Sequence, residues 1–237
     1  MNLSSELTIK IKYILDNYCF PFLRDSYFFM LLPMYLCFSK KYKQVMEFKA
    51  KAPYMSAEEY AEIYAETAPF HLSRPTDLNR ECVEKILKDV TGGSALDIGC
   101  GRCFLLKKIG ETHKIELTGL DLVLSETSDT DTNNFKIVNG TAESIPLEDK
   151  SIDTVICTHV LEHVIDLKLA ISEIRRVAKR RIIIVVPCER PYKYTFSLHL
   201  RFFPYIHSFL LEMMPFNKGK IICEKVGGDI YYLEDLS

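Results

Sequence analysis

The stretch SALDIGCGRCFL, residues 94–105, decides the fold. In it, a short apolar run contains an acidic residue, two glycines follow one residue apart, and an apolar helical pattern then begins. This order predicts a strand, a tight turn and the N-terminus of a helix. Glycines in such a turn can adopt a positive φ and let backbone N–H groups approach a ligand closely, and the helix end adds partial positive charge. The stretch therefore predicts a cradle for an adenine-containing cofactor.

The sequence after this turn alternates between short β-branched runs and helical patterns. Such alternation predicts parallel strands joined by right-handed helical crossovers, in an α/β fold. A final segment, 220–232, has the pattern of a hairpin that turns at Gly227-Gly228. The expected strands are 94–98, 115–121, 135–139, 152–157 and 181–187, and the expected helices include 102–109, with Phe104, Leu105 and Ile109 inward, and 166–178.

The segment before this domain has a different character. Residues 1–90 are interpreted as an N-terminal helical cap, and 91–237 as the main domain, with an insertion near 188–218 that covers an acceptor. Ser56-Ala57-Glu58-Glu59 has the pattern of a capping box, and a further helix is expected to start near Thr76-Asp77. The apolar run 27–38 is too short to span a bilayer. It is interpreted as a buried cap, a hydrophobic substrate wall or a weak membrane-surface contact.

Composition restricts the class of protein. The chain has 237 residues, 48% of them hydrophobic, and a formal net charge of -2. This charge argues against a nucleic-acid partner bound through a broad basic face. Eight cysteines and no recognisable signal peptide favour a reduced, cytoplasmic setting. Oligomeric state is not indicated.

Two of the expected strands end in acidic residues. In open parallel sheets, ligands bind beyond the carboxyl ends of the strands. Asp97 can accept hydrogen bonds from a ligand ammonium group, while the turn of Gly99, Cys100 and Gly101 passes beneath the ligand. Asp121, which precedes Leu122, closes the second strand about 20–25 residues after the glycine turn, as expected of a residue that binds ribose hydroxyls.

Two further strand ends complete the candidate site. After the third strand, the polar turn Thr141-Ala142-Glu143 can place a backbone N–H and a side chain against an adenine edge. The fourth strand ends near Cys157 and Thr158, facing the region where a reacting group would lie, and His159 follows it. Each of these features also has a plain structural interpretation as a loop or a strand end, so their combination carries the prediction.

The order and spacing of these segments resemble the class I S-adenosylmethionine-dependent methyltransferases, in particular their small-molecule, methyltransferase type 11-like branch. The resemblance covers residues 94–187. It implies a doubly wound, mostly parallel, seven-stranded Rossmann-like sheet that ends in an antiparallel hairpin strand. It also implies S-adenosylmethionine as cofactor and S-adenosylhomocysteine as product. The acceptor is expected to be methylated at oxygen, and its class stays open between a small metabolite, a lipid-linked or saccharide-type acceptor and a quinone-like ring. The turn residues, Asp121, the adenine-side loop and the segment 159–164 take the family's binding positions, and no metal is expected.

Two positions depart from the family pattern, and two histidines are candidate bases. Cys103 stands where the family usually has a third glycine, and Thr141 stands where it often has an aspartate. Because an oxygen acceptor gains from removal of its proton, His163 and His159 are the catalytic candidates. His199 and His207 in the late insertion are alternatives, and packing or capping roles are open for all four.

Other classes of protein remain open. A nicotinamide-dependent oxidoreductase would carry Gly-x-Gly-x-x-Gly, and the third glycine is missing. Cys100-Gly101-Arg102-Cys103 could be a dithiol redox centre, although that hypothesis explains neither Asp97 nor Asp121. A zinc site lacks a second ligand pair at suitable spacing. A non-catalytic cofactor-binding protein of the same fold is the remaining alternative.

Overall fold

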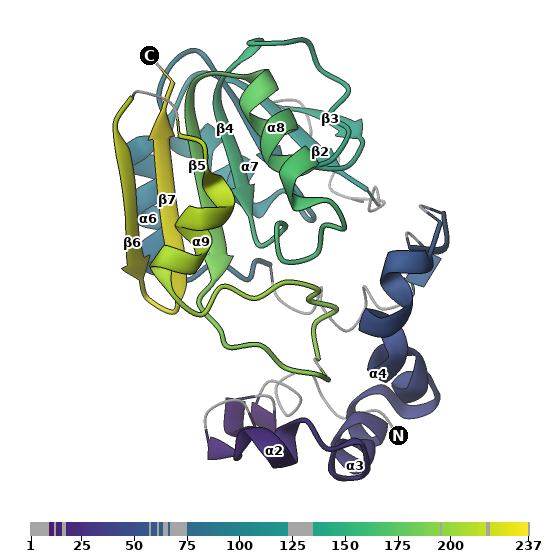
Figure 1. Ribbon diagram of the computed structural model, residues 1–237. Coiled ribbons are helices and arrows are strands. Elements are labelled where there is room, and N and C mark those ends of the chain that lie inside the picture. Colours follow the sequence, from purple (N-terminus) through teal and green to yellow (C-terminus); the bar gives the residue numbers. More distant parts are fainter. Residues whose placement is uncertain are drawn as a thin grey trace. The chain divides into compact units, whose positions relative to one another are not determined.

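The chain divides into two compact units, Met1–Arg74 with Pro191–Leu200, and Pro75–Arg190 with Arg201–Ser237. The computed structural model describes residues 10–11, 13–15, 18–56, 58–60, 62–63, 66, 75–122, 135–194, 196–216 and 219–236 (Figure 1). The second unit begins at Pro75 rather than at residue 91, and the expected insertion 188–218 is shared between the units. Among the described residues, no helix has the length and apolar character needed to cross a bilayer.

The second unit is built on a seven-stranded sheet with the order β3-β2-β1-β4-β5-β7-β6. Strands β1 to β5 are parallel, and β7 is antiparallel to both β5 and β6. The doubly wound, mostly parallel sheet is therefore confirmed, as is the closing hairpin. The strands are β1 (Ser94–Ile98), β2 (Glu116–Asp121), β3 (Lys136–Asn139), β4 (Ile152–Thr158), β5 (Ala178–Pro187), β6 (Ile221–Val226) and β7 (Asp229–Asp235).

Helices cover both faces of this sheet (Figure 1). On one face lie α8 (Leu167–Val177) and α9 (Ile206–Met213), and on the other lie α6 (Arg80–Asp89) and α7 (Phe104–Thr112). Successive β5 residues, such as Ile182 and Ile183, contribute alternately to the two cores, because side chains alternate across a strand. The central strands β4 and β5 are covered on both faces, which explains their nearly continuous apolar runs in the sequence.

The helix boundaries show which local signals dominate. α6 begins at Arg80 rather than near Thr76-Asp77, because the Asn79 side chain accepts a hydrogen bond from the Cys82 N–H at 2.8 Å and caps the helix. Asp166 caps α8 in the same way. In α7, Leu105, Leu106 and Ile109 are buried, whereas Phe104, which was expected inward, is only half-buried. α7 begins two residues later than expected, so Phe104 is its first residue.

The first unit is helical. It contains α2 (Pro21–Arg24), α3 (Tyr27–Phe38), the short helix η1 (Ser39–Lys41), α4 (Tyr42–Lys51) and η2 (Ala52–Tyr54). Met30, Met34, Cys37 and Phe38 of α3 form its core, together with apolar side chains of α4 and of 191–200. The predicted capping box is confirmed, because the Ser56 N–H bonds to Glu59 Oε2 at 2.9 Å and the Glu59 N–H bonds to Ser56 Oγ at 3.2 Å.

Candidate active site

The turn after β1 is held by the neighbouring strand and requires its first glycine. The N–H groups of Gly99 and Cys100 donate to the Leu120 carbonyl oxygen at 2.7 and 3.1 Å. Gly99 has a φ of +72°, and a Cβ atom there would lie 2.2 Å from Cγ2 of Val160. The turn therefore packs directly against the segment after β4, and only glycine fits at that contact.

The second glycine of the turn faces open space. Gly101 has a φ of +49°, and a Cβ atom there would meet no atom within 4 Å. Its N–H donates to Asp121 Oδ2 at 2.7 Å, which ties the turn to the end of β2. The amide of Asn139 in turn donates to the carbonyl oxygens of Asp121 and Leu122 at 3.2 and 2.9 Å. The ends of β1, β2 and β3 thus form one connected rim with room above it.

Asp97, on β1, is the most unusual charge of this rim. It is 3% exposed, and no hydrogen-bond donor in the described residues reaches its Oδ1. Burial raises its pKa well above the ordinary value, and electrostatic interactions with Cys103 and Asp121 add to this effect. A buried carboxylate oxygen without a donor is costly unless a ligand supplies one. An ammonium group meets that need.

Cys103 occupies the position where the family pattern usually has a third glycine. It precedes α7 with a φ of +58°, in the left-handed region that favours glycine. Its thiol is buried, and a hydrogen bond from Cys100 lowers the pKa of Cys103 while raising that of Cys100. Both cysteines are free thiols. The chain therefore keeps the backbone conformation of a glycine turn although the side chain differs.

The predicted residues of the loop after β3, Thr141, Ala142 and Glu143, do not all have the same role. Thr141 forms a β-bridge with Ser144, and Ala142 is buried. Glu143 Oε1 accepts hydrogen bonds from the N–H groups of Ile165 and Asp166 at 2.9 and 3.1 Å. Glu143 thus supports the segment that leads into α8, and its contact with a cofactor stays a prediction.

The residue directly after β4 is held between two carboxylates. His159 follows Thr158 with a φ of +54°. Its Nδ1 lies 3.4 Å from Glu162 Oε1 and its Nε2 lies 3.6 Å from Asp229 Oδ2, the first residue of β7. Burial alone would lower its pKa, but hydrogen bonds and attraction from Asp229 and Glu162 outweigh burial and raise the pKa to about 10. At neutral pH the ring is therefore a cation and cannot accept a proton as a general base.

Sequence reasoning identified neither of the two carboxylates, Glu162 and Asp229. It also missed Asn79, which orients Asp229. Asn79 Nδ2 donates to Asp229 Oδ2 at 2.8 Å and to the Val226 carbonyl oxygen at 3.1 Å. Glu162 is fully buried. Its position three residues after His159 was the available signal, whereas Asp229 is distant in sequence and is brought near by the sheet order alone.

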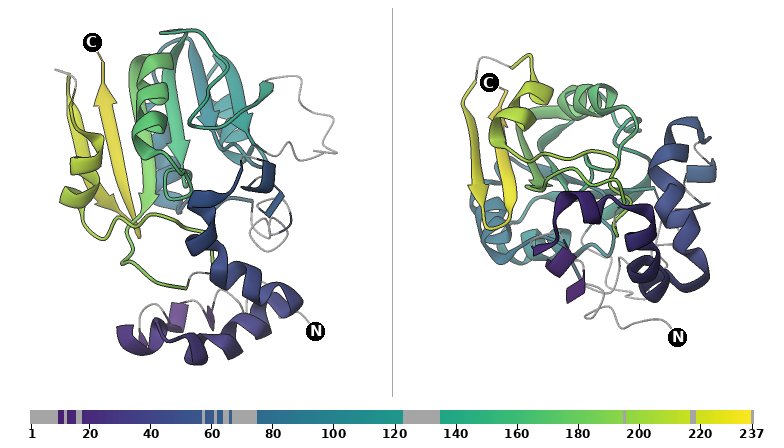
Figure 2. Two further views of the ribbon diagram at one scale, coloured as in Figure 1. Left: turned by 45° about the vertical axis from the view of Figure 1, so that its right-hand side comes forward. Right: turned by 60° about the horizontal axis from the view of Figure 1, so that its bottom comes forward.

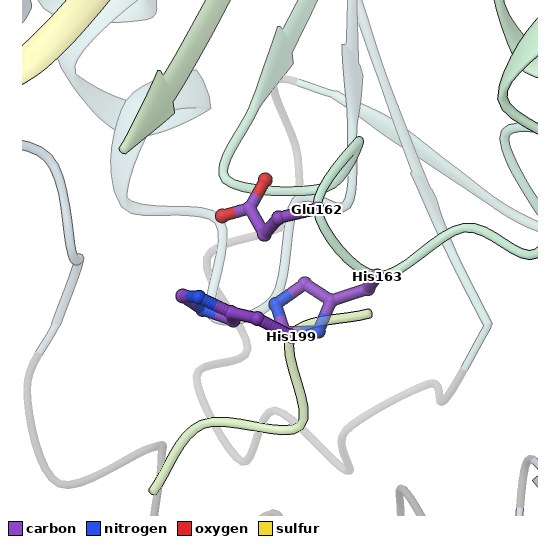
Figure 3. Close-up of side chains that lie close together, drawn as sticks. All are labelled: Glu162, His163 and His199. Atoms are coloured by element: carbon purple, nitrogen blue, oxygen red, sulfur yellow. The ribbon is translucent and has the colours of Figure 1, made fainter. Parts of the chain in front are cut away.

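His163 stays a candidate base. It is half-buried, its N–H donates to the Val160 carbonyl oxygen at 2.9 Å, and its side chain extends, with that of Glu162, from the turn after β4 (Figure 3). The turn is fastened by the N–H of Arg201, which donates to the Glu162 carbonyl oxygen at 3.0 Å. His199 belongs to the first unit, and the ring of His207 on α9 stacks on that of Tyr205.

Comparison with known proteins agrees with this geometry. A family model described as a methyltransferase domain matches residues 96–186. Demethylmenaquinone methyltransferase of Staphylococcus haemolyticus (strain JCSC1435) is 32% identical over 133 residues, which cover 49% of this chain and 55% of that protein. The chain thus spans about half the length of the relatives that it matches.

Solved structures share the fold at low sequence identity. Burkholderia thailandensis 1,6-didemethyltoxoflavin-N1-methyltransferase, solved with 1,6-didemethyltoxoflavin and S-adenosylhomocysteine, has a TM-score of 0.60 at 14% identity, over 76% of this chain and 90% of that one. The [4+2]-cyclase SpnF has a TM-score of 0.56 at 17% identity, over 71% of this chain and 75% of that one. Because a cyclase shares the fold, the reaction has to be argued from the site.

Proposed function

We propose that this chain binds S-adenosylmethionine at the carboxyl ends of β1 to β4 and methylates a small or lipid-linked acceptor. Its residues 96–186 form a class I S-adenosylmethionine-dependent methyltransferase domain of the type 11 branch. The observation that carries the proposal is the buried Oδ1 of Asp97, for which no described residue supplies a donor. The ammonium group of the cofactor would be that donor.

The other residues of the rim fit the remaining parts of the cofactor. The open space above Gly101 admits the ligand backbone. Asp121, half-buried at the end of β2, would accept from the ribose hydroxyls. Thr141 and Ala142 would line the adenine, and a threonine hydroxyl binds an amino group more weakly than a carboxylate would. Cys100 and Leu122 belong to the same rim, and Thr158 and His159 would lie nearest the methyl group.

The chemistry then rests on alignment and on a proton acceptor. When bound, S-adenosylmethionine supplies a methyl group already activated on a sulfonium, so transfer needs mainly alignment and exclusion of water. His163 would take the proton of an oxygen acceptor. His159, a cation between Glu162 and Asp229, would hold the turn that carries His163. Similarity to a demethylmenaquinone methyltransferase adds a quinone-type ring to the acceptors worth testing.

Calorimetric titration tests the cofactor assignment. Wild-type protein should bind S-adenosylmethionine and S-adenosylhomocysteine but not NAD. Asp121→Ala should weaken binding by roughly 1.5–3 kcal/mol, about 10- to 150-fold, because hydrogen bonds to a charged group are lost. Asp149→Ala, which removes an exposed carboxylate paired with Arg176, is the matched control. Equal affinities of the two variants would refute the site.

Turnover tests the reaction separately. With labelled S-adenosylmethionine and a panel of hydroxylated rings, including quinols, the wild-type protein should transfer label to at least one acceptor. His163→Ala should keep cofactor affinity and lose about 100-fold or more in rate, as removal of a general base does. Tight cofactor binding without transfer to any acceptor would favour the non-catalytic alternative, and a rate unchanged by His163→Ala would remove the base.

A further inference from the structure

Helix α3 in the first unit is apolar on both of its faces. All twelve of its residues, Tyr27–Phe38, are uncharged and apolar or aromatic. One face, with Met30, Met34 and Cys37, is fully buried in the core of the unit. The opposite face consists of four residues that we call the α3 outer face: Phe28, Leu32, Tyr35 and Leu36, which are 83%, 64%, 55% and 41% exposed. A helix with both faces apolar is typical of one that is covered on both sides.

The neighbouring helix α2 presents two more rings in the same unit. Phe20 and Phe22 are 67% and 71% exposed, and their rings stack with centroids 5.9 Å apart. α2 is anchored from within by Arg24, which is buried and donates to the Tyr194 carbonyl oxygen while its guanidinium lies over the Tyr192 ring. The outward rings are therefore not a result of loose packing. Figure 2 shows α2 and α3 as the purple to dark blue helices.

Lysines are concentrated in the segment that follows α3, between the acidic residues Asp25 and Glu47. No acidic residue lies between Ser26 and Met46, whereas lysines occupy positions 40, 41 and 43. Lys41 pairs with Glu66 at 3.2 Å, and Lys40 and Lys43 are exposed. Tyr35 of the α3 outer face packs edge-on against Tyr42, with ring centroids 5.7 Å apart. The lysines therefore belong to the segment that contacts the α3 outer face through Tyr42.

We propose that the α3 outer face, together with Phe20, Phe22, Lys40 and Lys43, is a docking surface for an anionic lipid bilayer. Exposed aromatic and aliphatic side chains flanked by lysines suit the boundary between headgroups and acyl chains, and each lysine near the surface is attracted by anionic lipids. With twelve residues, α3 can lie in that boundary but cannot span it. Two copies meeting through this face would each bring the same exposed lysines, which opposes a dimer. The proposal does not rest on the methyltransferase assignment.

Vesicle co-flotation of the full chain tests this surface. The wild type should float with vesicles of phosphatidylcholine mixed with phosphatidylglycerol, less with phosphatidylcholine alone, and less at raised salt because screening weakens the lysines. Phe28→Ser with Leu32→Ser should reduce the partition coefficient at least about tenfold, since buried apolar area drives interfacial binding. The matched control is Leu211→Ser with Phe216→Ser in the other unit, because Leu211 is 63% exposed against 64% for Leu32.

The lysines have their own test. Lys40→Ser with Lys43→Ser should remove the preference for phosphatidylglycerol, whereas Lys114→Ser with Lys225→Ser, which removes two exposed lysines of the second unit, should keep it. Unchanged thermal midpoints show that the variants fold. Failure of the wild type to float, or equal losses in the Leu32 and Leu211 variants, would overturn the proposal. So would a wild-type dimer in light scattering that Phe28→Ser with Leu32→Ser dissociates, because the surface would then be a protein interface.

Discussion

His159 makes a specific contribution to the dependence of stability on pH. Its pKa is about 10 in the folded protein, against 6.5 for an ordinary histidine. A group whose pKa is raised on folding stabilises the protein fully below the unfolded value and loses that contribution as the pH rises through the folded value. The stabilisation is therefore complete below about pH 6.5 and disappears as the pH rises past about 10.

The size of this effect follows from the same two values. At 1.4 kcal/mol per pH unit, linkage gives on the order of 4 kcal/mol at about pH 7 and about 1 kcal/mol at about pH 9.5. The wild type should thus lose about 3 kcal/mol of unfolding free energy between these pH values through His159 alone. The charges responsible are those of Glu162 and Asp229, 3.4 and 3.6 Å away, and neither can be replaced by solvent in so buried a position.

Urea denaturation at a series of pH values measures this contribution. His159→Asn is the best perturbation, because asparagine tolerates the φ of +54° at this position and does not titrate. The loss of stability between about pH 7 and pH 9.5 should be smaller in the variant than in the wild type by about 3 kcal/mol. Subtraction cancels the titration of cysteines and tyrosines common to both proteins. His113→Asn, which removes a histidine whose ring pairs with the Thr112 hydroxyl rather than with carboxylates, should behave as the wild type.

Two outcomes would refute this reasoning. A pH dependence that is the same in the wild type and in His159→Asn, within about 1 kcal/mol, would mean that the histidine is not a buried cation. A large change in His113→Asn would mean that the effect is not specific to the carboxylate pair. Asp229→Asn offers a graded check, since removal of one of the two carboxylates should lower the pKa of His159 and move the window toward neutral pH.

Two further predictions concern the rim of the site. Gly101→Ala places a Cβ atom in open space, whereas Gly99→Ala places one 2.2 Å from Val160. Calorimetry should therefore find that Gly101→Ala loses cofactor affinity at a cost of only about 1–2 kcal/mol in stability. Thermal unfolding should find that Gly99→Ala is strongly destabilised. Equal destabilisation of both would contradict this. Asp97→Asn should raise the unfolding free energy at pH values above the ordinary pKa of an aspartate, because burial raises the pKa of Asp97 and makes its ionisation unfavourable in the folded protein. It should also weaken cofactor binding in titration. A destabilised variant with normal affinity would show that Asp97 is structural.

The sheet could be predicted because its signals are local. Each of the five parallel strands is a short run that contains buried or half-buried apolar residues. Strand boundaries were predicted within three residues, as for 181–187 against Ala178–Pro187. The five inward residues of α8, from Leu167 to Val177, are all buried as their spacing indicates. The rim residues Asp97 and Asp121 followed from the same logic, since the ends of parallel strands share one edge of the sheet.

What the sequence could not predict depends on contacts between distant segments. The backbone at Cys103 keeps a left-handed conformation although the residue is not glycine, and no propensity scale indicates that. Glu143 is typical of a loop residue by sequence, yet its carboxylate binds the N–H groups before α8. Both cases are decided by packing around the site, which overrides local preference.

The C-terminal hairpin explains how the carboxylate of Asp229 comes to lie beside His159. β7 runs antiparallel to β5, with Asp229 opposite Pro187. An antiparallel strand therefore starts at the edge where the parallel strands end. The N–H of His159 donates to the Val185 carbonyl oxygen at 2.9 Å, so His159 lies at this same edge. Inserting one antiparallel strand beside β5 thus delivers a carboxylate to the edge that the parallel strands use for binding, and this makes His159 a fixed cation rather than a base.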